Sequence, residues 1–322
     1  MMSSTDFSKK RLAMVFTNEG ERISFSNDNL VVKSDDGEVK LQTTCYRISA
    51  LFIIGHVTVT SALIQKSGKF GFPIYLMTPT FRTYDIIGHK TEGHVELRER
   101  QYAYEGLDIG KKLIENKIDN QIQVLRSHRT NDWALRDSID DLRSLKDKVS
   151  LQPDVHSIMG IEGNAAKRYF QQQFEFKEWT GRRPRIKTDY INSTLDIGYT
   201  ILFNVVDSML SMYGFDTYKG VLHSCFYMRK SLVCDLVEPF RPMIDRQVRK
   251  SINLGQCKPE HFNVQNGRYL LSIEHQKDYA KFLSAPLIKN KDSMFRFFQS
   301  YYRCFDRSKD ISNYPVFRID GR

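Results

Sequence analysis

The sequence predicts an α+β protein, in which a small N-terminal β domain precedes a larger all-helical domain. Short runs of alternating apolar and polar residues fill the chain from Arg11 to about Gly88, and such alternation is typical of half-buried strands. After Gly88 the apolar residues recur at helical spacing instead. Because 322 residues exceed the usual size of one hydrophobic core, we expect two domains, over residues 1–88 and 89–322.

Strands are expected wherever an alternating run is bounded by turn residues in the N-terminal region. The runs are RLAMVFT (11–17), RISFS (22–26), NLVVKS (29–34), EVKLQT (38–43), YRISALFII (46–54) and FPIYLM (72–77). Asp36 and Gly37 lie between two of them and form a hairpin signal. One helix is expected over residues 60–68, with Thr60 as its N-terminal cap and Gly68 at its end.

Long helices are expected after residue 93, because apolar residues there recur every three or four positions. The predicted helical stretches are 94–128, 135–149, 158–176, 189–214, 220 to about 254, and 276–288. A loop over 177–189 separates two of them, since Gly181 and Pro184 argue against a helix. The C-terminal residues 307–322 are expected to form a loosely held tail.

The composition favours a globular protein with a polyanionic partner. Hydrophobic residues make up 41% of the chain, and Lys and Arg total 48 against 38 Asp and Glu, a formal net charge of +10. The five cysteines form no CxxC pair, which excludes a thiolate zinc site and a disulfide framework. No apolar run reaches about eighteen residues, the length that a membrane helix needs. We therefore expect a soluble protein in a reducing compartment, without membrane association.

Candidate catalytic residues are one histidine and three acidic side chains. Glu162 lies in GIEGNAAKRYF, and the stretch GVLHSCFYMRKSLVCDLVEPFRP (220–242) contains His223, Asp235 and Glu238. Each also has a purely structural interpretation. Glu162 would be an acid at a helix N-terminus, and His223 a hydrogen-bonded histidine of the core. Asp235 and Glu238 would form the solvated edge of a helix. Together they suit a hard divalent cation such as Mg²⁺ or Mn²⁺, which prefers oxygen ligands and tolerates an imidazole.

Basic residues cluster near these candidates, as expected for a site that acts on phosphodiesters. They are Arg182, Arg183, Arg185 and Lys187 in one loop, and Arg229, Lys230, Arg241, Arg246, Arg249 and Lys250 around the acidic pair. Phosphate contacts of this kind supply affinity and orientation but do not read sequence. A solvated basic face is the alternative interpretation.

Three segments resemble, in order and spacing, the signatures of a known family. They are GIEGNAAKRYF, then the stretch from YINSTLDIGYTILF to YKGVLH, then RKSLVCDLVEPFRP. The family is the CRISPR-associated spacer-acquisition integrase, the nuclease-like subunit that inserts new spacers into CRISPR arrays. The helical segment ENKIDNQIQVL, with Lys117, Asn120 and Gln121, is also similar to that family. The resemblance extends from about Arg11 to Leu254, and it implies a protein of the prokaryotic cytoplasm.

The resemblance implies a site for Mg²⁺ or Mn²⁺ in the helical domain, with Glu162, His223 and Glu238 as ligands and catalytic residues. Asp235 matches a neighbouring acidic position, where it would have a supporting or second-metal role. The family often has aspartate where this chain has Glu238, so the division of roles between Asp235 and Glu238 stays open. Arg182, Arg183, Tyr199, Arg229 and Arg241 are implied to lie close to bound DNA.

The implied reaction is transesterification, in which the 3′-hydroxyl of a short prespacer DNA attacks a phosphodiester at the repeat boundary of a CRISPR array. With water as nucleophile the same site would act as a DNA endonuclease. The resemblance also implies homodimers formed through the β domain, and a small ferredoxin-like partner subunit. Two alternatives remain: a metal-dependent structure-specific nuclease of DNA repair, and a non-catalytic DNA-binding subunit with a structural ion.

Overall fold

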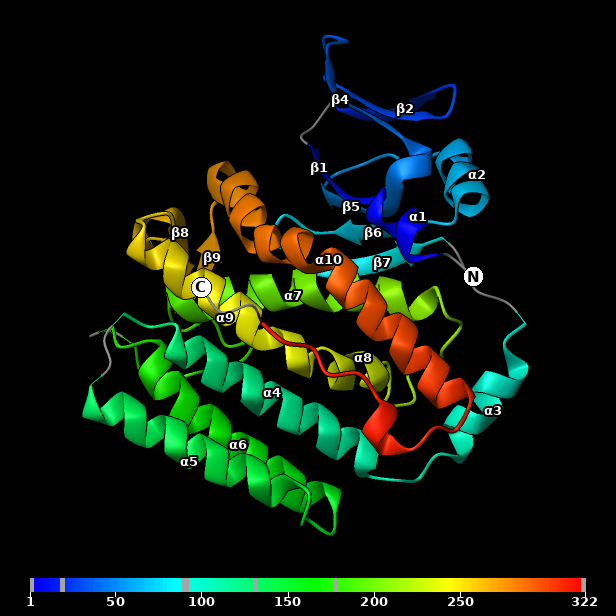
Figure 1. Ribbon diagram of the computed structural model, residues 1–322. Helices are drawn as coiled ribbons and strands as arrows, with labels where there is room; N and C mark the ends of the chain where they lie inside the picture. The colour runs from blue at the N-terminus through cyan, green and yellow to red at the C-terminus, as the bar shows by residue number, and fades with distance from the viewer. Residues whose placement is uncertain (1–2, 18–20, 89–92, 130–131, 177–178, 320–322) are drawn as a thin grey trace.

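A computed structural model describes residues 3–17, 21–88, 93–129, 132–176 and 179–319. It confirms the α+β prediction, because strands dominate the N-terminal part and long helices make up most of the rest. In Figure 1 the N-terminal strands lie in an upper lobe, and the long helices form a larger body beneath it.

The elements follow one another in two groups. The first group comprises α1 (Ser4–Ser8), β1 (Arg11–Thr17), β2 (Arg22–Ser26), β3 (Asn29–Lys33), β4 (Val39–Thr44), β5 (Ile48–Gly55), α2 (Ser61–Phe70), β6 (Ile74–Met77) and β7 (Thr83–Ile87). The second comprises α3 (Val95–Ala103), α4 (Asp108–Arg126), α5 (Trp133–Val149), α6 (Val155–Gln173), α7 (Tyr190–Ser211), α8 (Ser231–Leu236), the 3₁₀ turn η2 (Glu238–Phe240), α9 (Arg241–Asn253), β8 (Phe262–Gln265), β9 (Arg268–Leu271) and α10 (Gln276–Asp306).

Strand β5 joins the two parts of the molecule. It lies in a sheet of order β1–β5–β6–β7, pairs in parallel with β1 and β6, and leaves β7 antiparallel at the edge. Phe52 and Ile54 of β5 pack into the core of the helical part, while Leu51 and Ile53 pack into a smaller N-terminal core. A strand covered on both faces requires a nearly continuous apolar run, which explains the sequence of β5.

The remaining N-terminal strands form a separate antiparallel sheet of order β2–β3–β4. The predicted turn at Asp36 and Gly37 joins β3 to β4, with Gly37 at a φ of 88°. Thr60 caps α2 as predicted, but the helix continues through Gly68 and ends at Gly71, whose φ is 66°. Gly68 is therefore not the helix terminator. Strand β7 is an element that the strand prediction omitted.

Most predicted helices are confirmed, with corrections at three places. The stretch 94–128 is two helices, α3 and α4, separated by irregular residues 104–107. The stretch expected to be helical from 220 becomes helical only at Ser231. Helix α10 continues beyond the predicted end at 288 to Asp306, passing through Pro286. The hairpin β8–β9 was not predicted, although its turn is Asn-Gly, a strong hairpin signal.

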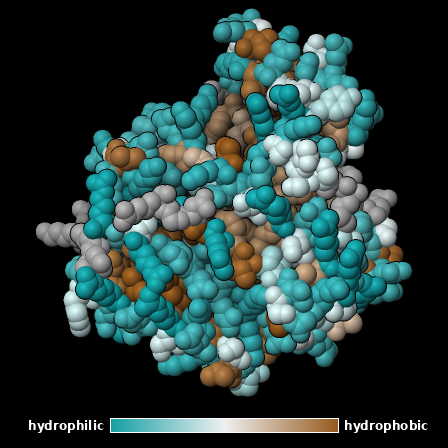
Figure 2. Space-filling view, in the orientation of Figure 1, coloured by the Kyte–Doolittle hydropathy of each residue, from teal (hydrophilic) through white to brown (hydrophobic). Residues whose placement is uncertain are grey.

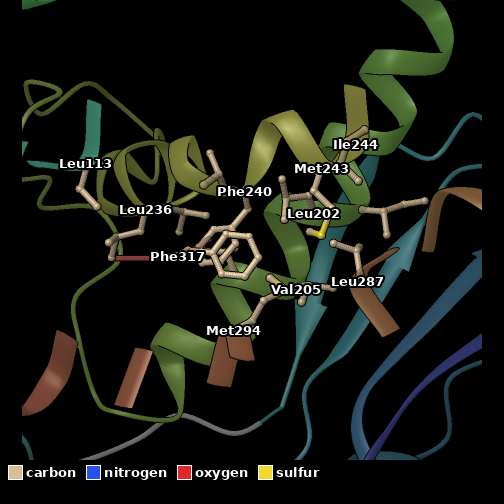
Figure 3. Close-up of a cluster of buried hydrophobic side chains, with 14 of the residues drawn as sticks. Leu113, Leu202, Val205, Leu236, Phe240, Met243, Ile244, Leu287, Met294 and Phe317 are labelled. Atoms are coloured by element: carbon tan, nitrogen blue, oxygen red, sulfur yellow. The ribbon is translucent and has the colours of Figure 1, made fainter. Parts of the chain in front are cut away.

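The helical core brings together residues that are far apart in the sequence. Figure 3 shows Phe240 next to Phe317, with Leu236, Met243 and Met294 around them. The ring centroids of Phe240 and Phe317 are 4.5 Å apart. The C-terminal segment therefore contributes to the same core as η2, which carries Glu238.

The C-terminal segment is firmly bound, so the prediction of a loose tail is wrong for the described residues up to 319. The Asn116 side chain donates to the Phe317 carbonyl at 2.7 Å and accepts from the Phe317 amide at 2.8 Å. The Asn120 side chain accepts from the Ile319 amide and donates to the carbonyls of Phe317 and Pro239. Phe317 and Ile319 are both buried, and Figure 1 shows this segment running along α4.

The predicted boundary between 1–88 and 89–322 falls at residues 89–92, which lie outside the described residues. The domain division and the expected dimerisation role of the first domain stay predictions. In the described residues, hydrogen bonds add to the packing of β5 between the two parts: the Tyr75 hydroxyl donates to Asp207 of α7 at 3.0 Å, and Asn204 of α7 donates to Thr83 of β7 at 2.7 Å.

The surface seen in Figure 2 is mostly hydrophilic, and its hydrophobic residues lie in small scattered patches. Among the described helices, none is both long enough and apolar enough to cross a membrane.

Replacing Phe317 tests how strongly the C-terminal segment supports the core. We expect Phe317→Ala to lower the free energy of unfolding by about 3 kcal/mol, because a buried aromatic ring is lost and a cavity remains. The control is Val316→Ala, whose side chain is 47% exposed and which should cost well under about 1 kcal/mol. Equal stability of the two variants in denaturant titrations would contradict this description of the segment.

Candidate active site

The three predicted catalytic residues line one cavity. Glu162 projects from α6, His223 lies in the loop before α8, and Glu238 begins η2; all three border a cavity of about 890 Å³. Lys117 of α4 and Arg241 of α9 border the same cavity. The structure therefore brings together side chains from five segments of the sequence.

Lys117 lies between the two glutamates. Its Nζ is 2.5 Å from Glu238 Oε2 and also contacts Glu162 Oε1. The Lys117 and Glu238 side chains are buried, at 8% and 7% exposed, and Glu162 is 20% exposed. Arg241 Nε lies 3.0 Å from the other Glu238 oxygen. The two carboxylates thus share the Lys117 ammonium, and Glu238 also pairs with the Arg241 guanidinium.

The charges of this cluster stabilise one another against the cost of burial. Burial alone would raise the pKa of Glu238, but the nearby Arg241 and Lys117 outweigh it and hold the pKa below its ordinary value. Burial alone would lower the pKa of Lys117, but Glu162 and Glu238 outweigh it and raise the pKa. Both Lys117 and Glu238 are consequently charged at neutral pH.

Asp235 is placed behind His223 rather than in the cavity lining. One oxygen accepts from the backbone amides of Val221 and Leu222, at 2.7 and 3.0 Å, and the other lies 2.6 Å from His223 Nδ1. A carboxylate only accepts, so Nδ1 carries the proton and Nε2 is left to bind another group. A Cβ on Gly220 would come within 2.6 Å of the carboxylate, so the loop requires glycine there.

This arrangement separates the roles of Asp235 and Glu238, which the sequence left open. Helix α8 ends at Leu236, so the two acids do not share a helix face as their spacing indicated. Asp235 orients His223, and Glu238 faces the cavity. Neither acid forms a solvated edge, because they are 1% and 5% exposed. Both carboxylate oxygens of Asp235 already accept hydrogen bonds, which favours a role in supporting His223 over a role as ligand of a second metal.

Glu162 lies in the middle of α6, not near its start. Asp154 caps the helix by accepting from the Ser157 amide at 2.8 Å, so α6 begins seven residues before Glu162. The interpretation of Glu162 as an acid that complements a helix dipole is therefore wrong. A Cβ on Gly160 or Gly163 would meet nothing within 4 Å, so the helix surface beside Glu162 is open.

Glu162, His223 and Glu238 are of the residue types that bind a divalent cation, although the Lys117 ammonium contacts both glutamates. In the described part of the chain, no three His, Cys, Asp or Glu side chains are already gathered as a metal-ligand group. Glu238 Oε2, however, is buried with the Lys117 ammonium as its partner at 2.5 Å, so it is freed if that ammonium moves, and His223 Nε2 is left available. Two carboxylates and one imidazole nitrogen form a donor set that Mg²⁺ or Mn²⁺ accepts once Lys117 moves aside.

Arg182, Tyr199 and Arg241 form one wall of the cavity. The Tyr199 ring contacts two guanidinium groups, at 5.2 Å from that of Arg182 and 4.8 Å from that of Arg241. The Tyr199 hydroxyl donates to Asp245 at 2.5 Å, and Arg182 pairs with Asp196 at 2.6 Å. Tyr199 and Arg182 are thus fixed in position by Asp245 and Asp196. The DNA contacts expected of these side chains would not require them to move.

The other two arginines expected near DNA are placed differently. Arg183 is exposed in the loop 181–187, where its backbone amide donates to Asn192 at 2.8 Å. The Arg229 guanidinium donates to the Ser224 carbonyl and lies 5.7 Å from the Phe226 ring, in the loop that follows His223.

Asp245 is a buried acid that the sequence reasoning missed. Burial raises its pKa from 3.8 to about 6, against the opposing hydrogen bonds of Tyr199 and Tyr169. Its position on α9 beside the apolar residues Met243 and Ile244 was the available signal, since an acid on a buried face requires partners.

The fold and the site together define an α+β protein whose helical part holds a carboxylate–histidine site with a cationic wall. The chain belongs to the family described as CRISPR associated protein Cas1, whose model matches residues 14–284. This finding confirms the family to which the sequence motifs pointed.

Individual relatives match over most of the chain. One named CRISPR-associated endonuclease Cas1 3, from Thermus thermophilus, is 30% identical over 71% of this chain and 70% of its own length. Another, CRISPR-associated endonuclease Cas1 2 from Rhodospirillum rubrum, is 30% identical over 84% of each chain. A solved CAS1 protein from Thermotoga maritima has the same fold, with a TM-score of 0.78 at 18% identity, covering 95% of this chain and 99% of its own.

Replacing Lys117 tests the buried ion cluster. We expect Lys117→Met to lower the free energy of unfolding by about 3 to 5 kcal/mol at neutral pH, because the buried Glu238 and the partly buried Glu162 lose a shared counter-charge. The added change Glu238→Gln should restore part of that loss, since it removes one of the stranded charges. Denaturant titration of the single and double variants measures both effects.

The matched control is Lys167→Met, since Lys167 is exposed at the rim of the same cavity. It should change the free energy of unfolding by less than about 0.5 kcal/mol. The described cluster would be contradicted if Lys117→Met were as stable as this control.

The raised pKa of Asp245 predicts that the free energy of unfolding depends on pH. Because its folded pKa is raised, its contribution to stability is present below about pH 4 and is lost as the pH rises through about 6. We expect Asp245→Asn to remove this loss, so its stability relative to wild type should increase by up to roughly 3 kcal/mol between pH 4 and 6. Denaturant titrations over this range measure the difference. The exposed control Asp137→Asn should show no such trend, and parallel curves for Asp245→Asn and wild type would refute the assignment.

Proposed function

We propose that this protein is a metal-dependent DNA integrase of CRISPR adaptation that joins the 3′-hydroxyl ends of short prespacer DNA to the repeat boundaries of a CRISPR array. It would also act as a DNA endonuclease when water replaces the 3′-hydroxyl. The observation that carries the proposal is the convergence of Glu162, His223 and Glu238 on one cavity with cationic walls.

The shape and charge around the cavity support a nucleic-acid substrate. A second hollow of about 620 Å³ shares Arg182, Tyr199 and Arg241 with the first. The basic residues Arg82, Arg185 and Lys187 border this second hollow. Two adjoining hollows with basic walls provide a path for a phosphate backbone from one hollow to the other.

The side chains have distinct roles in the proposed reaction. Glu162, Glu238 and His223 would hold Mg²⁺ or Mn²⁺, while Asp235 keeps His223 in the tautomer that offers Nε2. A bound divalent ion supplies charge neutralisation at the attacked phosphate and activation of the nucleophilic hydroxyl. Arg241 holds one Glu238 oxygen in place. The ammonium of Lys117, once displaced from between the carboxylates, can contact a phosphate oxygen in the cavity.

The proposal is also supported by what related proteins are described as doing. A casposase bound to integration product has a TM-score of 0.78 at 20% identity, covering 96% of each chain. A Cas6-RT-Cas1–Cas2 complex contains a chain with a TM-score of 0.79 at 22% identity, covering 95% of this chain and 36% of that one. By extension, we propose double-stranded DNA, a second copy of this chain and a small ferredoxin-like subunit as partners here.

A strand-joining assay tests the proposal. The protein is incubated with fluorescent prespacer DNA and a supercoiled plasmid that carries a CRISPR array, in Mg²⁺ or Mn²⁺. We expect labelled DNA to become joined to the plasmid. Plasmid cleavage without joining would instead favour the repair nuclease, in which water is the only nucleophile.

Variants of the site distinguish catalysis from DNA binding. We expect Glu162→Gln, His223→Ala and Glu238→Gln each to reduce joining by about a hundredfold or more, because phosphate charge is no longer neutralised. DNA affinity should change little. The control Glu175→Gln, at an exposed residue of the same cavity wall, should join normally. Wild-type joining by the three site variants would show that the carboxylates have no catalytic role.

A further inference from the structure

The loop that follows His223 ends in an exposed apolar tip that the proposed reaction does not use. Phe226, Tyr227 and Met228 are consecutive and are 70%, 85% and 76% exposed. Single exposed apolar residues are ordinary on a protein surface, but three adjacent large ones indicate a contact surface. We call this group, residues 226–228, the apolar tip.

The loop holds the apolar tip outward in a defined conformation. The Arg229 amide donates to the Phe226 carbonyl at 3.0 Å, which closes a turn, and Met228 in that turn has a φ of 56°. A non-glycine residue in the left-handed region is strained, so the surrounding bonds must enforce it. The Ser231 hydroxyl does so by donating to the Ser224 carbonyl at 3.0 Å, and the Arg229 guanidinium donates to the same carbonyl.

Both ends of the loop are fixed to the active-site region. At one end His223 is bound to Asp235. At the other end Lys230 pairs with Asp207 of α7 at 2.8 Å. Phe226 is three positions after His223 in the chain, so their Cα atoms lie within about 10 Å of each other. Whatever group the apolar tip contacts therefore lies next to the substrate of the proposed site.

We propose that the apolar tip is a stacking wedge for DNA bases beside the phosphodiester under attack. This inference rests on the proposed function, because it takes DNA as the substrate. Aromatic side chains next to a cation are a common platform for bases that are out of the duplex stack, and here Arg229 lies 5.7 Å from the Phe226 ring. Apolar wedges also hold open a distorted base step. A branched junction, which joining would create, exposes such bases.

The test compares intact duplex with branched DNA, in which a prespacer end is already joined at a repeat boundary. The variant is Phe226→Ser/Tyr227→Ser. The control is Trp133→Ser, which changes an aromatic residue of α5 that is 78% exposed. Fluorescence anisotropy at two salt concentrations measures affinity, and 2-aminopurine placed beside the junction reports base stacking.

For the wedge, we expect the double variant to bind branched DNA about tenfold more weakly than wild type, as for the loss of a stacked base. Its affinity for intact duplex and its salt slope should not change, because no phosphate contact is removed. Binding of wild type should change the 2-aminopurine fluorescence, and the double variant should not reproduce that change. Trp133→Ser should behave as wild type, and unchanged melting temperatures should show that both variants fold.

The remaining outcomes overturn the wedge in different ways. If the double variant binds branched DNA as wild type does, the wedge is wrong while the proposed function stands. An equal loss for duplex and branched DNA would also overturn it, since stacking would not be the cause. If the variant instead dissociates a dimer without changing DNA affinity, the apolar tip is a protein contact. If wild type binds neither DNA, both the wedge and the proposed function fail.

Discussion

The buried ion cluster of Lys117, Glu162 and Glu238 is the constraint on which the rest of the site depends. Two carboxylates at this depth would be unfavourable without a counter-charge, and Lys117 supplies it from a third helix. A lysine that neutralises the site also competes with any divalent cation for the same oxygens. In the proposed enzyme, a metal ion that binds would therefore replace the Lys117 ammonium. The carboxylates would then be neutralised by a positive charge both before and after the metal binds.

The positions of the ligands follow from contacts farther away. Asn120 of α4 binds the carbonyl of Pro239, next to Glu238, and also binds the C-terminal segment at Phe317. One amide side chain thus connects α4, η2 and the end of the described chain. Asp235 has an equivalent role for His223, because it holds the backbone and the ring of the same loop. The site is therefore supported by hydrogen bonds between elements that are distant in sequence.

Local patterns were enough to predict most strands and helices, the turn at Asp36 and the cap at Thr60, because alternation, helical spacing and turn chemistry are encoded within a few residues. They could not show that Asp235 faces a loop and Glu238 a cavity, since helix α8 ends at Leu236 and a 3₁₀ turn begins at Glu238. Lys117 was noticed through family resemblance, but its role required knowing that α4 lies against α6 and η2. The docking of the tail depends on Asn116 and Asn120, about two hundred residues away, and no local pattern reports a contact at that separation.

The most direct test of this account is the anomalous diffraction of a crystal soaked in Mn²⁺. The account predicts one strong peak within coordination distance of Glu162, Glu238 and His223 Nε2, with the Lys117 ammonium displaced from its position between the carboxylates. Asp235 should remain bound to His223 Nδ1. A peak elsewhere, with Lys117 still bridging the two glutamates at saturating Mn²⁺, would contradict the assignment of these residues as metal ligands.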